Sequence, residues 1–284
     1  MLMLRAPRPE DAESLGRICY DAFAAISDAH NFPRDFPNPA HAVGLMTSMI
    51  ANAGFHGVVA EEDGRILGSN FLDERCAVFG VGPITVDPRI QNQGVGRRLM
   101  EAVLERTDEW AAPGVRLVQA GYHCRSLSLY VSLGFDVREH LSCMTGPAIE
   151  GLPAGGQARA ATPADEEACN RLCRRVHGHD RAGELSQAIG QGTAMVVERT
   201  GRITGYASQL AYFGHSVGET TGDIEALIAA SGEVGPPGIL VPSRNGELFR
   251  WCLDHGLRVT QTLTLMTRGL YNEPAGAWMP SVLY

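Results

Sequence analysis

The apolar positions of this chain follow two different spacings in turn. Leu15, Cys19 and Phe23 recur every four residues behind Pro9–Asp11, a proline and two acidic residues that suit the first turn of a helix. Val58, Val59 and Ala60 are apolar, and with Glu61 they lead into a Gly-Arg-Ile turn, which predicts a strand and a hairpin. Helix and strand segments of this kind predict an α/β fold with α+β character.

Later segments repeat these signals in the same order. The motif Arg5–Asp11 returns as Arg159–Asp165, with arginine, proline and aspartate in matching places. The strand and hairpin of residues 58–66 return at 196–203, where Gly-Arg-Ile again forms the turn. We therefore expect two copies of one α/β unit, joined by a segment rich in glycine and proline at 146–156.

The length of 284 residues suits about two domains of ordinary size. We expect an N-terminal domain over residues 1–147 and a C-terminal domain over 156–284. Hydrophobic residues make up 44% and charged residues 20%, which is typical of globular proteins and excludes fibrous or disordered chains. The net charge of −8 argues against a nucleic-acid partner, since no basic run could neutralise a row of phosphates.

No apolar run reaches the ~18 residues of a membrane span, and the N-terminus lacks the apolar core of a secretion signal. The seven cysteines form no C-x-x-C pair, which favours a reducing compartment. Cys169, Cys173 and His177 share one helix face, but structural zinc draws its ligands from separate segments, so we expect core packing and no metal. The sequence thus predicts a cytoplasmic protein without a membrane partner.

The most informative segment is a strand, a glycine loop and a helix in succession. Residues 78–86 are largely β-branched, and apolar spacing from Leu99 onward predicts a helix. Between them, Gly94 and Gly96 leave room for a ligand close to the unsatisfied N–H groups of the first helical turn. The helix dipole favours an anion such as a pyrophosphate at that place.

Three observations narrow the kind of phosphate loop. Arg97 and Arg98 lie in the first helical turn, where cations oppose the dipole unless an anion is bound; an ordinary solvated face is the alternative. A P-loop needs a lysine, and all 24 basic residues of the chain are arginines. A dinucleotide fingerprint needs G-x-G-x-x-G, of which only one interval is present.

The hexad Gln91-Asn92-Gln93-Gly94-Val95-Gly96 resembles the acyl-CoA loop Q/R-x-x-G-x-G/A of the GNAT N-acetyltransferase superfamily. A second feature follows at the right distance, because residues 123–135 resemble the GNAT ending N-x-x-A-x-x-L-Y-x-x-L-G-F. The resemblance covers residues 2–146. It implies acetyl-CoA as co-substrate, no metal, and acetyl transfer to a primary amine by direct attack on the thioester. It also implies two tandem GNAT-like domains, each a mixed, mostly antiparallel sheet flanked by helices.

The resemblance also assigns roles to single residues. Tyr130 has the position of a tyrosine that protonates the departing sulfur, and a phenol with a pKa of about 10 holds its proton at neutral pH; packing beside the cofactor is the alternative. His123 stands where the superfamily usually has asparagine, and this departure puts its cofactor contact in question. The N–H of Val86 is the expected donor to the thioester carbonyl. The other expected cofactor contacts are Ile84, Thr85, Gln91, Gln93, Gly94, Val95, Gly96, Arg97 and Arg98.

The acceptor side is less defined. Asp73 and Glu74 could take a proton or bind a cationic acceptor, or could equally be the solvated charges of a hairpin. The run His30–Pro37, which contains Phe32, fits either a pocket wall or a packed loop. We expect a small-molecule amine or a peptide as acceptor and leave the oligomeric state open, a homodimer included. The competing hypothesis is a non-catalytic acyl-CoA-binding or regulatory module in which Tyr130 only packs.

The second copy is expected to be degenerate. At an offset of 122 residues Gly94 maps to Ser216, so the phosphate loop would be lost. At the same offset Tyr130 maps to Cys252, so the acid would be lost as well. The expected role of this copy is to stabilise the first domain or to close the acceptor pocket.

Overall fold

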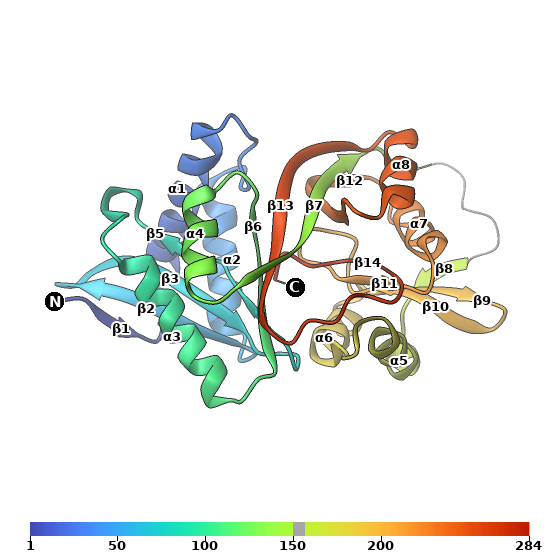
Figure 1. Ribbon diagram of the computed structural model, residues 1–284, viewed down its shortest axis with the longest axis horizontal. Coiled ribbons are helices and arrows are strands. Elements are labelled where there is room, and N and C mark those ends of the chain that lie inside the picture. Colours follow the sequence, from blue (N-terminus) through green and yellow to red (C-terminus); the bar gives the residue numbers. More distant parts are fainter. Residues whose placement is uncertain (150–156, 284) are drawn as a thin grey trace.

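The computed structural model describes residues 1–149 and 157–283 (Figure 1). The N-terminal half contains β1 (Met3–Arg5), α1 (Ala12–Ala29), α2 (Pro39–Ala51), β2 (Phe55–Glu62), β3 (Arg65–Asp73), β4 (Phe79–Val81), β5 (Thr85–Val86), α3 (Val95–Glu109), β6 (Gly114–Ala120), α4 (Cys124–Ser132) and β7 (Asp136–Gly146). The C-terminal half contains β8 (Gln157–Ala160), α5 (Glu166–His177), α6 (Ala182–Gln191), β9 (Met195–Arg199), β10 (Arg202–Ala207), β11 (Ser216–Gly218), α7 (Thr221–Ala230), β12 (Val234–Pro242), α8 (Gly246–Asp254), β13 (Arg258–Gly269) and β14 (Ala277–Met279). The predicted α/β class, with sheets flanked by helices, is confirmed, whereas most of the predicted joint at 146–156 lies outside the described residues.

The hairpin of β2 and β3 is buried on both faces. Val58 belongs to the hydrophobic core around α3, together with Leu99, whereas its neighbour Val59 belongs to the core under α1 and α2, together with Leu15. Successive side chains of a strand point to opposite faces, so this hairpin needs consecutive apolar residues. Full burial of each such side chain contributes about 1.5–3 kcal/mol.

Both halves begin with the same ion-pair network. In each, an arginine of the first strand contacts an aspartate at the start of the first helix and a glutamate of the next strand. The pairs are Arg5 with Asp11 at 2.7 Å and Glu61 at 2.7 Å, and Arg159 with Asp165 at 2.8 Å and Glu198 at 3.3 Å. The repeat seen in the sequence therefore extends to side-chain contacts.

Strands from both halves share one large sheet. Its order is β1-β2-β3-β4-β6-β13-β7-β12, and β5 also pairs with β3. β13 lies between β6 and β7 and is antiparallel to both, while β7 lies between β13 and β12. Figure 1 shows these strands in the middle of the molecule, where the two halves meet. Each half thus places one strand inside the other, an exchange that the sequence repeat did not predict.

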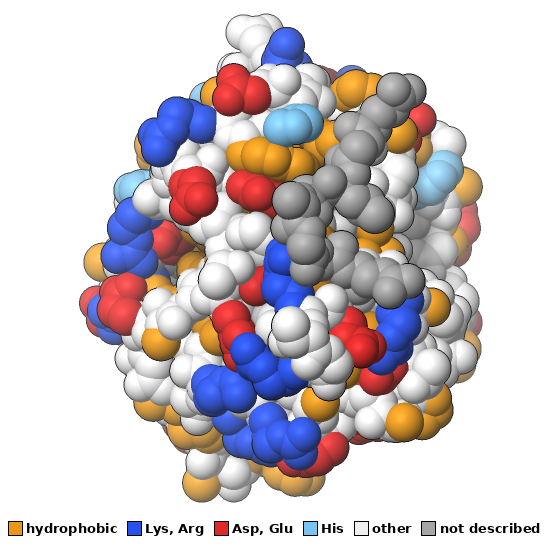
Figure 2. Space-filling model, turned by 90° about the vertical axis from the view of Figure 1, so that its right-hand side faces the viewer, with side chains coloured by type: hydrophobic (Ala, Val, Ile, Leu, Met, Phe, Trp, Pro, Cys, Tyr) orange, Lys and Arg blue, Asp and Glu red, His pale blue; other side chains and the backbone are white. Residues whose placement is uncertain are grey.

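A second sheet, in the order β14-β11-β10-β9-β8, belongs to the C-terminal half. The face of this half shown in Figure 2 carries arginine and acidic side chains next to one another. In the same half, Arg174 pairs with Asp180 at 2.6 Å and Arg175 pairs with Glu219 at 2.5 Å. Charges of opposite sign are therefore matched locally on this half.

Helices α4 and α8 begin in the same way. Nδ1 of His123 accepts the N–H of Ser126 at 3.2 Å, and the side-chain oxygen of Asn245, 122 residues later, accepts the N–H of Leu248 at 3.2 Å. Burial lowers the pKa of His123, which favours the neutral ring that can accept this bond. The histidine that departs from the superfamily pattern therefore caps its helix as the asparagine does.

We predict that His123→Asn keeps the stability of the wild type at neutral pH, because asparagine is a strong N-cap, whereas His123→Ala lowers the free energy of unfolding by about 1 kcal/mol. The lowered pKa of His123 means that its contribution is complete above the unfolded histidine pKa of about 6.5 and is lost as the pH falls through the folded value. Urea unfolding at about pH 7.5 and about pH 5 should therefore show that the free energy of unfolding of His123→Asn rises relative to that of the wild type at the lower pH. An identical pH dependence for both proteins would contradict this.

We also predict that the two halves unfold as one unit. A fragment of residues 1–147 would leave β7 without either of its neighbours, and we expect it not to fold. The whole chain should give one urea transition, coincident by circular dichroism and by the fluorescence of Trp110 in one half and of Trp251 and Trp278 in the other. Two separate transitions, or a natively folded fragment, would argue against the strand exchange.

Candidate functional site

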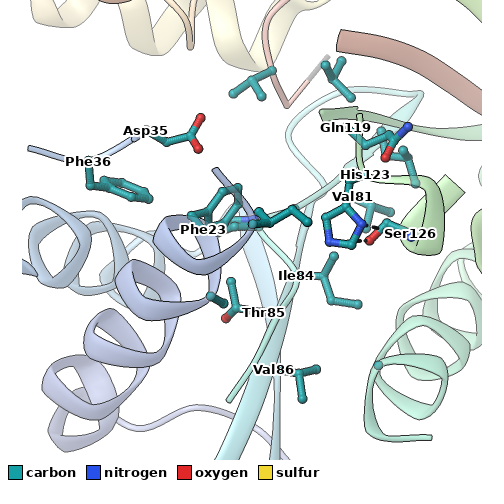
Figure 3. A pocket seen from close by; sticks show the side chains of 18 of the residues that line it. Phe23, Asp35, Phe36, Val81, Ile84, Thr85, Val86, Gln119, His123 and Ser126 are labelled. Atoms are coloured by element: carbon teal, nitrogen blue, oxygen red, sulfur yellow. Dashed lines mark hydrogen bonds between the residues drawn. The ribbon is translucent and has the colours of Figure 1, made fainter. Parts of the chain in front are cut away.

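A cavity of about 760 Å³ opens where parallel strands separate. β4 and β6 pair only at Phe79–Val115 and Gly80–Arg116. Beyond these pairs, Ile84–Val86 lines one side of the cavity and Leu117–Gln119 lines the other. The remaining walls come from α1, the loop before α2, α2 itself, the N-termini of α3 and α4, and the C-terminal half (Figure 3). The cavity thus lies at the carboxyl ends of two diverging strands.

The first turn of α3 faces this cavity. Gly94 precedes the helix in the left-handed conformation, with φ of 84°, and the helix has no side-chain cap. Gly94, Val95 and Gly96 all line the cavity. An uncapped helix N-terminus presents unsatisfied N–H groups and the positive end of the helix dipole. This turn therefore fits an anionic group such as a pyrophosphate, as the glycine pattern predicted.

Arginines surround the same turn. Arg97 lines the cavity and donates to Ser132 Oγ at 2.7 Å, whereas Arg98 is exposed and, like Gln93, does not line it. Arg125, which was not among the predicted site residues, lines the cavity from the first turn of α4 and donates to Gln91 Oε1 at 2.6 Å. Arg125 lies within residues 123–135, the segment that resembles the GNAT ending, and this position was the signal in the sequence that could have identified it. Among the described residues its hydrogen-bond partners, Gln91 and Asn92, are neutral amides, so its charge is available to an anion.

β5 turns one backbone edge toward the cavity. The N–H of Asp87 donates to the carbonyl of Leu67 in β3 at 2.8 Å. N–H groups alternate in direction along a strand, so the N–H of Val86 points away from β3, toward the cavity that this residue lines. The carbonyl of Val86 accepts the side-chain amide of Gln91 at 3.2 Å. The N–H of Val86 is therefore oriented so that it could donate to a carbonyl group bound in the cavity.

Tyr130 lies in α4 and lines the cavity, although only 6% of its surface is exposed. Its ring packs edge-on against Phe135, with 6.2 Å between the ring centres. Burial raises the pKa of Tyr130 to about 12, so the phenol keeps its proton at neutral pH. His123 lines the cavity next to it and, as Figure 3 shows, contacts Ser126.

The three acceptor candidates lie outside the residues that line the cavity. The carboxylate of Asp73 is buried and pairs with Arg75 at 2.5 Å, and that of Glu74 pairs with Arg106 at 2.8 Å. Phe32 stacks on Tyr122 with ring centres 4.1 Å apart. Both carboxylates already have a guanidinium partner, and the aromatic ring supports a neighbouring side chain.

Asp35 is a cavity-lining acid that the sequence analysis did not select. It lies in the run His30–Pro37, whose sequence fitted either a pocket wall or a packed loop. Burial raises the pKa of its carboxyl group, while Gln261 Nε2 of β13 donates to Asp35 Oδ1 at 3.4 Å. Nothing in the spacing of that run indicated which of its residues would face the cavity.

The corresponding opening of the C-terminal half is filled. There, β11 and β12 take the places of β5 and β6, and α8 follows β12 as α4 follows β6. β14 pairs with β11, with Trp278 opposite Val217, and also contacts β12. A strand of the chain itself therefore occupies the place that the cavity has in the N-terminal half.

The mapping of Gly94 to Ser216 is wrong. Ser216 lies inside β11, and α7 begins at Thr221, so the glycine loop has no counterpart. A deletion shifts the offset in this region, although the offset of 122 is correct for α8. The first turn of α7 is satisfied by a capping box of Thr220 and Asp223, whereas α3 has no capping side chain.

Two further findings concern the described residues. Within 1–149 and 157–283, no group of three or more histidine, cysteine, aspartate or glutamate side chains is arranged to hold a metal ion. None of the helices in this part of the chain is both long and apolar enough to cross a membrane.

Comparisons with known proteins agree with this geometry. The sequence matches the family model described as an acetyltransferase (GNAT) domain over residues 53–137. No match is found among curated proteins. The structure is similar to an acetyltransferase candidate of Pyrococcus horikoshii at 15% identity, with a TM-score of 0.74, covering 97% of this chain and 94% of that one.

Two other similar structures also extend over the whole chain. A GCN5-related N-acetyltransferase of Sphaerobacter thermophilus is 18% identical, with a TM-score of 0.61 and 96% of each chain covered. A tandem GNAT protein from the clavulanic acid biosynthesis pathway is 14% identical, with a TM-score of 0.56, covering 95% of this chain and 98% of that one. These identities show a common fold. Residues 53–137 therefore match the GNAT acetyltransferase domain, and the fold of nearly the whole chain is similar to that of these three proteins.

Proposed function

We propose that this protein is an acetyl-CoA-dependent N-acetyltransferase that transfers the acetyl group to a primary amine by direct attack on the thioester. One observation carries the proposal: a single cavity contains the uncapped first turn of α3, the free edge of β5 and the protonated phenol of Tyr130. Groups suited to bind an anion, to donate to a carbonyl and to act as a general acid thus line one space, which supports the proposal. The GNAT domain itself supports acyl transfer.

The residues of the N-terminal half fit acetyl-CoA in an extended conformation. The N–H groups at Gly94–Gly96, with the charges of Arg97 and Arg125, suit the pyrophosphate. The edge of β5 can pair with the amide groups of the pantetheine arm as an added strand would. The N–H of Val86 would then polarise the thioester carbonyl, where negative charge develops during attack.

Besides binding the cofactor, direct acetyl transfer requires a neutral amine and a proton for the departing sulfur. A neutral amine nitrogen forms the C–N bond while the C–S bond breaks, and Tyr130 gives its proton to the departing sulfur. Because the thioester is already activated, holding both reactants in line supplies much of the rate. The filled opening of the C-terminal half supports one active site per chain.

We predict that Tyr130→Phe lowers the turnover number at least about 10²-fold in an assay of free CoA release, because a general acid contributes 10²- to 10⁴-fold. The dissociation constant of CoA, measured by titration calorimetry, should change less than about twofold, since binding uses the backbone at Gly94–Gly96. Tyr271→Phe is the matched control, because that ring does not line the cavity and its hydroxyl has no hydrogen-bond partner among the described residues. Unchanged turnover in Tyr130→Phe would remove it as the acid. CoA binding without turnover in the wild type would leave a binding module.

We further predict one CoA site per chain, weakened about tenfold by Arg125→Ala, which corresponds to about 1.4 kcal/mol of binding free energy. The reason is loss of a positive charge beside the glycine loop that no acidic side chain in the described part of the chain neutralises. Arg171→Ala is the control, because Arg171 is exposed and pairs with Glu167 on the distant helix α5. Calorimetry that gives two sites per chain would show that β14 does not close the second opening.

A further inference from the structure

The cavity has two ends of different chemistry. Its donor end contains the backbone of the glycine loop and β5 described above. Its other end is lined mainly by apolar and aromatic side chains from α1, the loop before α2, α2 and the C-terminal half, including Phe23, Ile26, Phe36, Leu45, Tyr212 and Leu283. In Figure 3, Phe23 and Ile84 lie between Asp35 on one side of the cavity and His123 on the other.

Asp35 is the acid of this apolar end. No ion pair among the described residues involves it. Its neighbour Arg34 is directed elsewhere, because the guanidinium pairs with Asp28 at 2.6 Å and donates to Tyr20 at 3.0 Å. A carboxylate among apolar groups is costly unless a cation joins it. The missing partner is therefore expected from the ligand.

The carboxylate is held in place from the other half of the chain. Gln261 of β13 donates to Asp35 at 3.4 Å and accepts the hydroxyl of Tyr122 at 3.4 Å. Tyr122 in turn lies 3.4 Å from Ser27 Oγ of α1 and stacks on Phe32. Both Gln261 and Ser27 are buried, so this chain of contacts fixes the direction of Asp35.

The same end selects against other amines. The carboxylate of an amino acid would find no available arginine there, because Arg34 is already paired. A polyamine would place a second ammonium against apolar side chains, with one acid for two charges. Burial of an apolar body, in contrast, gains about 25 cal/mol per Å² of surface removed from water.

We infer that the acceptor is a small primary amine with an aryl or branched alkyl body, bound by its ammonium group to Asp35. This inference rests on the proposed function and names the substrate class of the same site. Asp35 takes one proton from the ammonium, and the neutral nitrogen forms the C–N bond as the C–S bond breaks. The second proton lost by nitrogen replaces the one that Tyr130 gives to sulfur, so one proton per turnover leaves Asp35 for solvent.

The test compares four amines in the CoA-release assay: phenethylamine and 3-methylbutylamine, phenylalanine, and spermidine. Phenethylamine differs from phenylalanine by a carboxylate, and spermidine adds charge without an apolar body. We expect kcat/KM for the two apolar amines to exceed that for the other two at least about tenfold. Asp35→Asn should lower kcat/KM for phenethylamine about 10²-fold, with partial recovery in Asp35→Glu. Asp21→Asn on the exposed face of α1 is the matched control and should leave it unchanged.

A binding measurement separates this inference from the proposed function. Calorimetry of phenethylamine and of phenethyl alcohol with the CoA complex does not depend on turnover. Tighter binding of the amine that Asp35→Asn abolishes supports the inference, even if no amine is acetylated and the proposed function fails. Equal binding to wild type and Asp35→Asn overturns it. Preferred turnover of phenylalanine or spermidine also overturns the inference while leaving the acetyltransferase proposal intact.

Discussion

The backbone pairing of β13 with both β6 and β7 is the constraint on which the rest of this molecule depends. It joins two copies of one unit into a continuous sheet, because β7 is held in turn between β13 and β12. It also brings Gln261 of the second half against Asp35 of the first. The apolar end of the cavity therefore has its shape only when both halves are assembled, whereas the donor end is formed by residues of the N-terminal half alone.

The sequence predicted the donor end because its signals are local. Gly94 precedes α3 in the left-handed conformation and Gly96 lies in the first turn of that helix, so both positions can be read from a few neighbouring residues. The apolar end depends on segments more than two hundred residues apart, as in the contact of Asp35 with Gln261. No spacing rule within one run could select Asp35 over its neighbours, or foresee that Asp73 would be neutralised by Arg75.

The internal repeat shows where a constant sequence offset identifies equivalent residues in the two halves and where it does not. A constant offset was correct at the N-caps His123 and Asn245, where the helix start fixes the residue that must accept an N–H. It failed at Ser216, because strands tolerate deletion of the loop that follows them while their pairing register is kept. Hydrogen-bonded register is therefore a safer guide to equivalence between the two halves than distance along the chain.

In the second half, β14 would compete with any free ligand for the place beside β11. The short connection 270–276 ties this strand to β13, so its local concentration at β11 is set by the tether and not by the solution. For short flexible tethers such effective concentrations reach about the millimolar range. A cofactor present at lower concentration, and offered no better contacts than Trp278 and Met279 make there, would not displace it. The repeat thus keeps its architecture, while the place that is an open cavity in the first half is part of the protein's own interior in the second.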